Sequence, residues 1–211
     1  MMIIYGCANT RSTRVLWALE EAGAAYHYVA VDLRAGAAQQ PDYLALNPGG
    51  KVPTLVDGDF ILTESAAICG YIGDQFPASR LTPPAGSQQR AHYDQWCFFT
   101  LSELEQALWT LSKHTFALPE ARRVPAVLDT ARWEFARAAK VLAKGLGARE
   151  WIVGDHFTAA DLLIGQTLAW AQASKLPLEH ANLSAYATRL LTRPAWTKAR
   201  QRERADSGAT S

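Results

Sequence analysis

The spacing of apolar residues in the first third of the chain predicts a small mixed sheet with helices. Residues 2–5 form an isoleucine-rich run ending at Gly6, which is typical of a buried strand. A helix is expected next, because apolar residues recur at three- and four-residue spacing while Arg14 and Glu21 lie mostly off that stripe. Residues 26–32 alternate and predict a second strand, parallel to the first because the crossover is too long for a hairpin. The chain therefore opens with a βαβ unit.

The following segment predicts three further elements and completes this first domain. Residues 41–46 fit a short helix that stops at an Asn-Pro-Gly-Gly sequence. Two short apolar runs, residues 52–56 and 60–63, bracket an Asp-Gly-Asp turn and predict a hairpin. A helix then begins near Ser65 and breaks before Pro77. The predicted order is βαβ-α-ββα.

A proline-rich segment separates this domain from an all-helical remainder. Residues 77–86, PASRLTPPAG, contain three prolines and one glycine without periodicity, which is typical of a linker. No convincing strand pattern follows it. Helical periodicity instead covers residues 87–113, 119–146, 157–174, 183–192 and 195–204. The predicted fold class is α/β plus all-α, with a first domain at 1–76, a linker at 77–86 and a helical domain at 87–211.

One helix start in the second half carries a sharp local signal. Thr158 stands at the N-cap position and Asp161 three residues later, which is the spacing of a capping box. Phe157 and Leu162 are placed to form a hydrophobic staple around it. An acid in this pattern favours a structural role for Asp161 over a catalytic one.

Composition and charge exclude several classes of function. The 211 residues are 49% hydrophobic and 19% charged, which fits a globular protein with a sizeable core. Twenty-one basic residues against twenty acidic ones give a net charge of +1, so no overall field attracts nucleic acid or an anionic membrane. No apolar run approaches the roughly 20 residues that span a bilayer, and we expect a cytoplasmic protein.

The cysteines favour neither disulfides nor a metal site. Cys7, Cys69 and Cys97 are far apart and odd in number, and the sequence has no CxxC pair. We therefore expect reduced thiols and no bound metal.

Four sequence segments together resemble the cytosolic glutathione S-transferases over almost the whole chain. They are residues 14–21 (RVLWALEE), 47–55 (NPGGKVPTL), 64–68 (ESAAI) and the Thr158–Asp161 box. The resemblance is to family members of bacterial type, and it implies a thioredoxin-like N-terminal domain, an all-helical C-terminal domain and a homodimer. The dimer would bury part of the helix that begins at Ser65 and of the helix over residues 87–113.

The resemblance also implies a glutathione site. Pro53 would be cis, and the backbone of Val52 would pair with the cysteinyl residue of glutathione in the manner of a sheet edge. Ser65 would bind the γ-glutamyl carboxylate at a helix start, Glu64 the neighbouring ammonium, and Lys51 the glycyl carboxylate. From the residues alone, Pro53 could be an ordinary trans proline, Ser65 a plain N-cap and Lys51 a solvated surface lysine.

The group that activates the thiol is less clearly marked. Lowering a thiol pKa by about two units requires about 2.7 kcal/mol of differential stabilisation, which a hydroxyl or amide donor can supply. Counting back from Arg14 places Asn9 where the serine classes carry their serine, with Thr10 beside it and Ser12 beyond. Tyr5 stands where tyrosine-type enzymes carry their hydroxyl. We rank Thr10 first, then Asn9, Ser12 and Tyr5, although Thr10 or Ser12 could simply cap the first helix.

The second domain offers aromatic residues for an electrophile pocket. Tyr93, Trp96, Phe99 and Trp109 occur at helical spacing, where packing in the core is the commoner role. The function expected from the resemblance is conjugation of glutathione to a small hydrophobic electrophile, as in detoxification. Two alternatives remain open: a non-catalytic binding or regulatory protein of the same fold, and a glutathione-dependent thiol reductase that uses Cys7.

Overall fold

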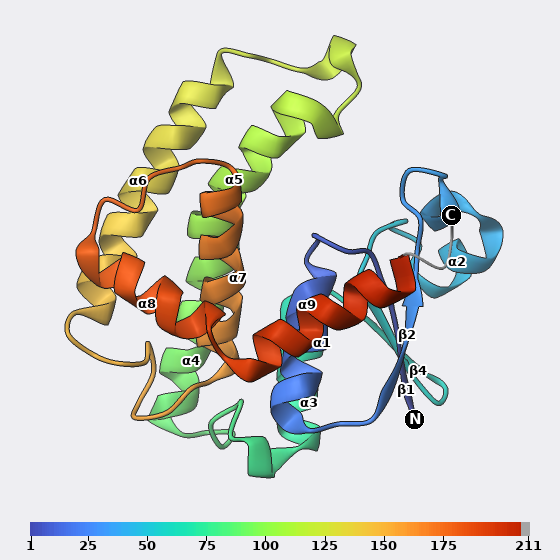
Figure 1. The fold of residues 1–211 in the computed structure, drawn as a ribbon, viewed down its shortest axis with the longest axis horizontal. Coiled ribbons are helices and arrows are strands. Elements are labelled where there is room, and N and C mark those ends of the chain that lie inside the picture. Colours follow the sequence, from blue (N-terminus) through green and yellow to red (C-terminus); the bar gives the residue numbers. More distant parts are fainter. Residues whose placement is uncertain (208–211) are drawn as a thin grey trace. The chain divides into compact units, whose positions relative to one another are not determined.

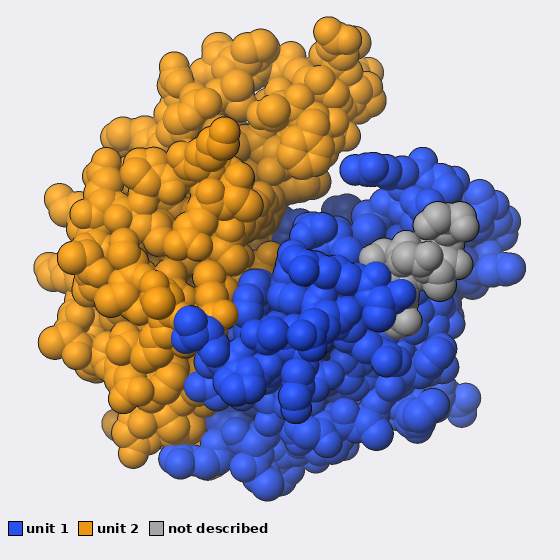
Figure 2. Space-filling model, in the orientation of Figure 1, with its two compact units in different colours: residues 1–82, 192–211 blue, residues 83–191 orange. Residues whose placement is uncertain are grey.

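The computed structural model describes residues 1–207, which form two compact units (Figure 2). Unit 1 comprises residues 1–82 together with the segment that begins at Thr192. Unit 2 comprises residues 83–191. The division after Thr82 falls inside the predicted linker.

Unit 1 is built on a four-stranded sheet in the order β2-β1-β3-β4 (Figure 1). The strands are β1 (Met2–Gly6), β2 (Tyr26–Ala30), β3 (Thr54–Asp57) and β4 (Phe60–Thr63). β1 and β2 are parallel because a helix crosses between them, whereas β3 is antiparallel to both β1 and β4. A tight turn at Gly58, with φ at 61°, joins β3 to β4.

The helices of unit 1 complete the predicted arrangement. They are α1 (Ser12–Ala22), α2 (Pro41–Leu46) and α3 (Ser65–Gln75), with 3₁₀ turns at Ala37–Gln39 and Pro77–Ser79. α1 packs against α3. Ile4 of β1 is fully buried, whereas the next residue, Tyr5, belongs to a separate apolar cluster with Tyr43 of α2. The thioredoxin-like order βαβ-α-ββα is confirmed.

The last helix, α9 (Pro194–Ser207), belongs to unit 1 by its packing. It contacts α1, where the Trp196 and Trp17 rings meet edge to face at a centroid distance of 4.9 Å. Arg193, just before α9, forms an ion pair with Glu21 of α1. Unit 2 is therefore shorter than the predicted helical domain of residues 87–211. The apolar side chain of Trp196 on α9 packs on the indole of Trp17 and thereby joins α9 to unit 1.

Unit 2 is all-helical, as predicted. Its α-helices are α4 (Gln88–Phe99), α5 (Glu105–Ser112), α6 (Val127–Leu146), α7 (Ala159–Ala173) and α8 (Ala181–Leu191). A 3₁₀ turn lies at Glu120–Arg122. The single helix expected over residues 87–113 is interrupted by a π-helical segment, Thr100–Leu104, and a second one follows at Lys113–Ala117. Hydroxyls contribute to these interruptions, since Thr100 and Thr115 each donate to the carbonyl four residues earlier, at 2.7 Å.

The predicted capping box at the start of α7 is present. The Asp161 carboxylate accepts hydrogen bonds from the backbone N–H and hydroxyl of Thr158, from the N–H of Ile152 (2.8 Å) and from the Tyr186 hydroxyl. Asp161 is fully buried, and burial raises its pKa. Its donors all come from neighbouring structure in unit 2, which is the structural role expected for it.

Within residues 1–207, no helix has the length and apolar character that crossing a bilayer requires. The same residues contain no cluster of His, Cys, Asp and Glu able to bind a metal ion.

Candidate functional site

The segment before β3 forms one wall of the candidate site, which we call the Val52 wall (residues 51–53). The peptide bond between Val52 and Pro53 is cis, as the resemblance implied. The Lys51 carbonyl accepts two hydrogen bonds, from the Tyr43 hydroxyl at 2.6 Å and from Nδ2 of Asn47 at 2.8 Å. The wall is therefore fixed by one side chain of α2 and one directly after it.

The same two side chains also bind the start of β3. Oγ1 of Thr54 lies 3.0 Å from the Tyr43 hydroxyl and 3.2 Å from Nδ2 of Asn47. Oδ1 of Asn47 accepts from the Gly49 N–H at 3.0 Å, so the whole Asn47 amide is used. Burial raises the pKa of the Tyr43 phenol, which keeps it a hydrogen-bond donor. The paired residues of β3 begin at Thr54, so the backbone of Val52 lies just outside the register of β3 with β1 and β4.

A second part of the site lies at the start of α3. Ser65 is 5% exposed, and its Oγ accepts a hydrogen bond from Nη1 of Arg14 at 3.3 Å. Glu64, directly before it, is exposed and has a positive φ of 65°. A helix N-terminus, a hydroxyl and a guanidinium together favour an anion such as a carboxylate.

Arg14 was not singled out as a site residue by its sequence, and the structure corrects its placement. It is fully buried in α1, although the helical pattern placed it off the apolar stripe. The available signal was its spacing, since Arg14 and Ala18 lie four residues apart and share a helix face.

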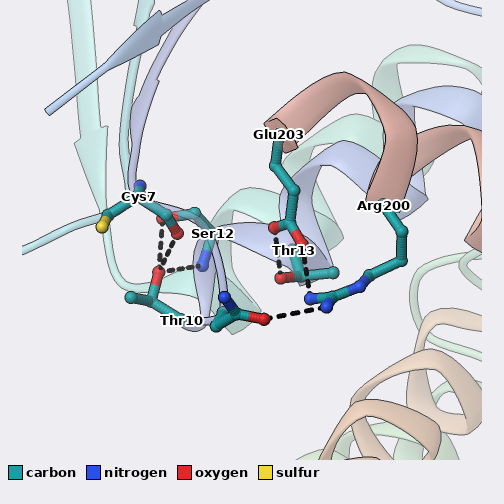
Figure 3. A network of polar contacts seen from close by, with 7 residues as sticks. Cys7, Thr10, Ser12, Thr13, Arg200 and Glu203 are labelled. Atoms are coloured by element: carbon teal, nitrogen blue, oxygen red, sulfur yellow. Dashed lines mark hydrogen bonds and ion pairs between the residues drawn. The ribbon is translucent and has the colours of Figure 1, made fainter. Parts of the chain in front are cut away.

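The candidate hydroxyls of the loop between β1 and α1 bond to one another (Figure 3). The Thr10 hydroxyl has one proton, which is directed to the Cys7 carbonyl at 2.6 Å or to Oγ of Ser12 at 2.9 Å. It also accepts from the Ser12 N–H, and Oγ of Ser12 accepts from the Cys7 N–H at 3.2 Å. Ser12 is fully buried. Both hydroxyls are thus engaged in shaping the loop.

Asn9 differs from these hydroxyls because it is exposed and bound from outside the loop. Its φ is 60°, a region that asparagine tolerates better than most residues. Oδ1 of Asn9 accepts from Nη2 of Arg200 on α9 at 2.8 Å. Nδ2 of Asn9 makes no hydrogen bond within residues 1–205, the part of the chain whose side chains the structure describes.

Tyr5 and Cys7 lie near this loop in settings that favour structural roles. Tyr5 packs edge to face on Tyr43 with a centroid distance of 6.0 Å, in the cluster that includes Val52. Burial raises the pKa of the Cys7 thiol, which disfavours the thiolate that a redox role requires.

The four aromatic candidates of unit 2 are divided between core and surface. Tyr93 is 3% exposed with the Arg90 guanidinium over its ring, so it packs in the core. Trp96 and Phe99 are partly exposed and meet edge to face at 5.3 Å, and Trp109 is also partly buried. Trp96 also lines a cavity of about 490 Å³ within unit 2. Their contribution to an electrophile pocket stays a prediction.

Comparison with known proteins identifies the family. A model of the glutathione S-transferase N-terminal domain matches residues 1–74, and a model of the glutathione S-transferase C-terminal domain matches residues 105–194. Glutathione S-transferase GstA of Escherichia coli O157:H7 is 32% identical over 179 residues, which are 83% of this chain and 86% of that protein.

Two further relatives agree. Glutathione S-transferase GST-4.5 of Xanthomonas campestris is 32% identical over 74% of this chain and 78% of that protein. The solved structure of a sphingomonad glutathione S-transferase complexed with glutathione is 31% identical, covers 95% of this chain and 98% of that one, and has a TM-score of 0.84. The chain therefore belongs to the glutathione S-transferase family.

Proposed function

We propose that the protein binds glutathione in unit 1 and transfers its thiolate to a small hydrophobic electrophile. The observation that carries this proposal is the anion site at the start of α3, where Ser65 lies against the buried Arg14. Glutathione carries a free carboxylate on its γ-glutamyl end, and this site offers a hydroxyl, helix N–H groups and a nearby guanidinium.

The rest of the peptide would lie along the Val52 wall. The γ-glutamyl ammonium would face the exposed Glu64 carboxylate, one residue from the anion site. The cysteinyl backbone would pair with the N–H and C=O of Val52, as an added strand does at a sheet edge. Lys51 is exposed and would bind the glycyl carboxylate.

The thiol would be activated by Asn9, which now ranks ahead of Thr10. The single Thr10 proton is already directed to acceptors of its own loop, whereas Nδ2 of Asn9 has two protons to donate. A donor to the thiolate stabilises it relative to the thiol and lowers the thiol pKa. The thiolate then forms a bond to the electrophilic carbon, and the leaving group departs with its electron pair.

The electrophile would be bound by aromatic side chains of unit 2. Trp96 and Phe99 are the better candidates among the four, because Tyr93 is buried in the core. The identity of the electrophile is set by this packing, so we propose only its class, a small apolar molecule.

Glutathione titration tests the proposal, with a matched serine as control. Ser65→Ala removes a hydrogen bond to a charged ligand, and we expect calorimetry to show glutathione affinity lowered on the order of tenfold. Ser87 also begins a helix and accepts from the Arg90 N–H at 3.0 Å, so Ser87→Ala should cost stability and leave affinity unchanged. Absence of heat and of a thermal shift with millimolar glutathione would refute the proposal.

Turnover of an activated aryl halide separates conjugation from the alternatives. We expect loss of activity in Asn9→Ala and retention in Cys7→Ser. Loss only in Cys7→Ser would support the thiol reductase, and binding without turnover would support a non-catalytic protein.

We also propose a homodimer that acts in the cytoplasm. Phe60 and Ile61 on β4 are 46% and 41% exposed, and Phe98 on α4 is 70% exposed. Sedimentation should show a dimer that Phe98→Asp weakens and that Phe116→Asp, at a residue 69% exposed in unit 2, does not. Cell fractionation tests the location.

A further inference from the structure

α9 contacts α1 at two places with different surroundings. Next to its start, Arg193 donates to both carboxylate oxygens of Glu21, at 2.6 and 2.8 Å. This ion pair lies near the end of α1 that is far from the loop between β1 and α1. Close to the other end of α9, Arg200 and Glu203 contact the start of α1 and that loop (Figure 3).

Glu203 connects α9 to the start of α1, directly after the loop, through a fully buried carboxylate. Oε2 of Glu203 accepts from the Thr13 hydroxyl in the first turn of α1 at 2.8 Å. Arg200, one turn earlier on α9, forms an ion pair with Oε1 of Glu203. Hydrogen bonds to ionised groups are stronger than neutral ones, so this contact can fix the start of α1, where the loop ends.

Arg200 binds the side chain of Asn9 in the loop. Its Nη2 lies 2.8 Å from Oδ1 of Asn9. A guanidinium has donors and no acceptor, so the amide atom that faces it must be the oxygen. The Asn9 amide is planar, and fixing its oxygen turns Nδ2 away from Arg200. The donor end of the amide is therefore left for a ligand.

The two charges also matter to a nearby thiolate. An unpaired Glu203 carboxylate would oppose a second negative charge, and the Cys7 thiol in the same loop already has its pKa raised in part by Glu203, after the larger effect of burial. Arg200 and Arg204 face Glu203 from α9, while Asp32 and Arg34, after β2, act on the loop. Pairing with Arg200 offsets the Glu203 charge where a thiolate would form.

We propose that Arg200 and Glu203 of α9 are positioning residues for thiol activation: Arg200 binds Oδ1 of Asn9, Glu203 pairs with Arg200 and binds Thr13 at the start of α1, and together they present Nδ2 of Asn9 to the glutathione sulfur. This inference rests on the proposed function, in which Asn9 donates to the thiolate. It assigns the C-terminal helix a role in catalysis beyond covering α1.

Arg200→Gln tests the inference, with Arg193→Gln as its matched control. Each change removes an arginine that pairs with an acid where α9 meets α1: Arg193 pairs with Glu21 of α1, and Arg200 pairs with Glu203 of α9. We expect Arg200→Gln to raise the pKa of the enzyme-bound glutathione thiol by about one unit and to lower kcat at neutral pH about tenfold. Ultraviolet absorbance of the thiolate across pH gives this pKa. Arg193→Gln should lower only the melting temperature.

A double-mutant cycle shows whether Arg200 acts through Asn9. In the Asn9→Ala background, Arg200→Gln should give little further loss of kcat, because the amide it positions is absent. Arg200→Lys keeps the positive charge and an N–H donor for Oδ1 of Asn9, so it should recover part of the thiolate signal that Arg200→Gln loses. Glutathione affinity measured at a pH below the bound-thiol pKa, where the thiol is protonated, should remain within about a factor of two in all these variants, because the anion site and Val52 wall are untouched.

Each outcome supports or overturns the inference. If wild type binds no glutathione or shows no thiolate, the proposed function fails and the inference fails with it. If wild type shows the thiolate and Arg200→Gln shows the same thiol pKa, or the same loss as Arg193→Gln, only the inference is overturned. Additive losses in the Asn9→Ala cycle would also overturn it.

Discussion

Two segments of unit 1 frame the candidate glutathione site, and different parts of the chain fix them. The Val52 wall is bound by Tyr43 and Asn47, which precede Lys51 by 8 and 4 residues. The loop at Asn9 is bound by Arg200, which follows it by 191 residues. The wall therefore forms with the local chain around α2 and β3, whereas the loop depends on the docking of α9.

This difference separates two steps of the proposed function. Contacts at the wall and at Ser65 would determine how tightly glutathione binds, since they meet its backbone and carboxylates. Contacts at Asn9 would determine how readily the thiol ionises. Changes at the wall should therefore alter affinity with the bound-thiol pKa unchanged. Changes on α9 should raise the bound-thiol pKa with the affinity for the protonated peptide unchanged.

Removing the asparagine that fixes the wall should have the largest effect. Asn47→Ala deletes hydrogen bonds to the Lys51 carbonyl, to Thr54 and to the Gly49 N–H. We expect a loss of about 2 kcal/mol in the free energy of unfolding and a glutathione affinity at least about tenfold weaker. Denaturant unfolding and calorimetry measure the two effects.

Asn182 provides the control for this prediction. Its Nδ2 also donates to two carbonyls, those of Ala143 and Gly147, at 2.9 and 3.0 Å, but within unit 2. Asn182→Ala should lower stability and leave glutathione affinity unchanged. Equal affinity losses in the two variants would contradict a specific role for the wall.

The loop hydroxyl allows a smaller test of the other segment. Thr10→Ala removes the bonds to the Cys7 carbonyl and the Ser12 N–H and should cost about 1 kcal/mol of stability. Thr10→Ser keeps the hydroxyl and should have the stability of the wild type. Because Thr10 shapes the loop, kcat should fall less in Thr10→Ala than in Asn9→Ala. A larger fall in Thr10→Ala, with stability intact, would make Thr10 the thiol activator.

The comparison also explains which features the sequence could predict. The βαβ-α-ββα order followed from apolar spacing. The wall was implied by the family resemblance that the segment 47–55 carries, and its contacts join residues close in sequence. Arg200 and Glu203 gave no such signal, since they lie on a strongly polar helix and act on residues about 190 positions away. The burial of Arg14 was missed because a charged residue in a helix is usually solvated.

The ranking of the loop residues shows a second limit. Thr10 and Ser12 were reasonable donors by residue type, but a hydroxyl has only one proton. The proton of Thr10 is hydrogen-bonded to an acceptor of its own loop, the Cys7 carbonyl or Oγ of Ser12. Sequence cannot show how hydrogen bonds are distributed within a loop. Asn9 gains its position in the ranking from a contact that only the folded chain makes.

The smallest expected effect concerns the charge of Glu203 and has a definite sign. Burial raises the pKa of the Glu203 carboxyl above its usual value, so folding favours the protonated acid. Its contribution to stability is then fully present below the pKa of the unfolded chain and is lost as pH rises through the folded pKa. Glu203→Gln cannot ionise, so the stability of wild type relative to this variant should fall as pH rises over that window.

Denaturant unfolding of both proteins at several pH values measures this difference, and Asp161, whose pKa is also raised by burial, cancels because both proteins contain it. A relative stability of wild type that grows with rising pH would mean that Arg200 and Thr13 outweigh burial and that Glu203 stays ionised in the fold. In that case the loop would be bound by a permanent charge. The expected decline in relative stability would instead mean that the contact of α9 with α1 and the Asn9 loop weakens as pH rises. The neutral hydrogen bonds of Tyr43 and Asn47 at the Val52 wall would not change over the same pH range.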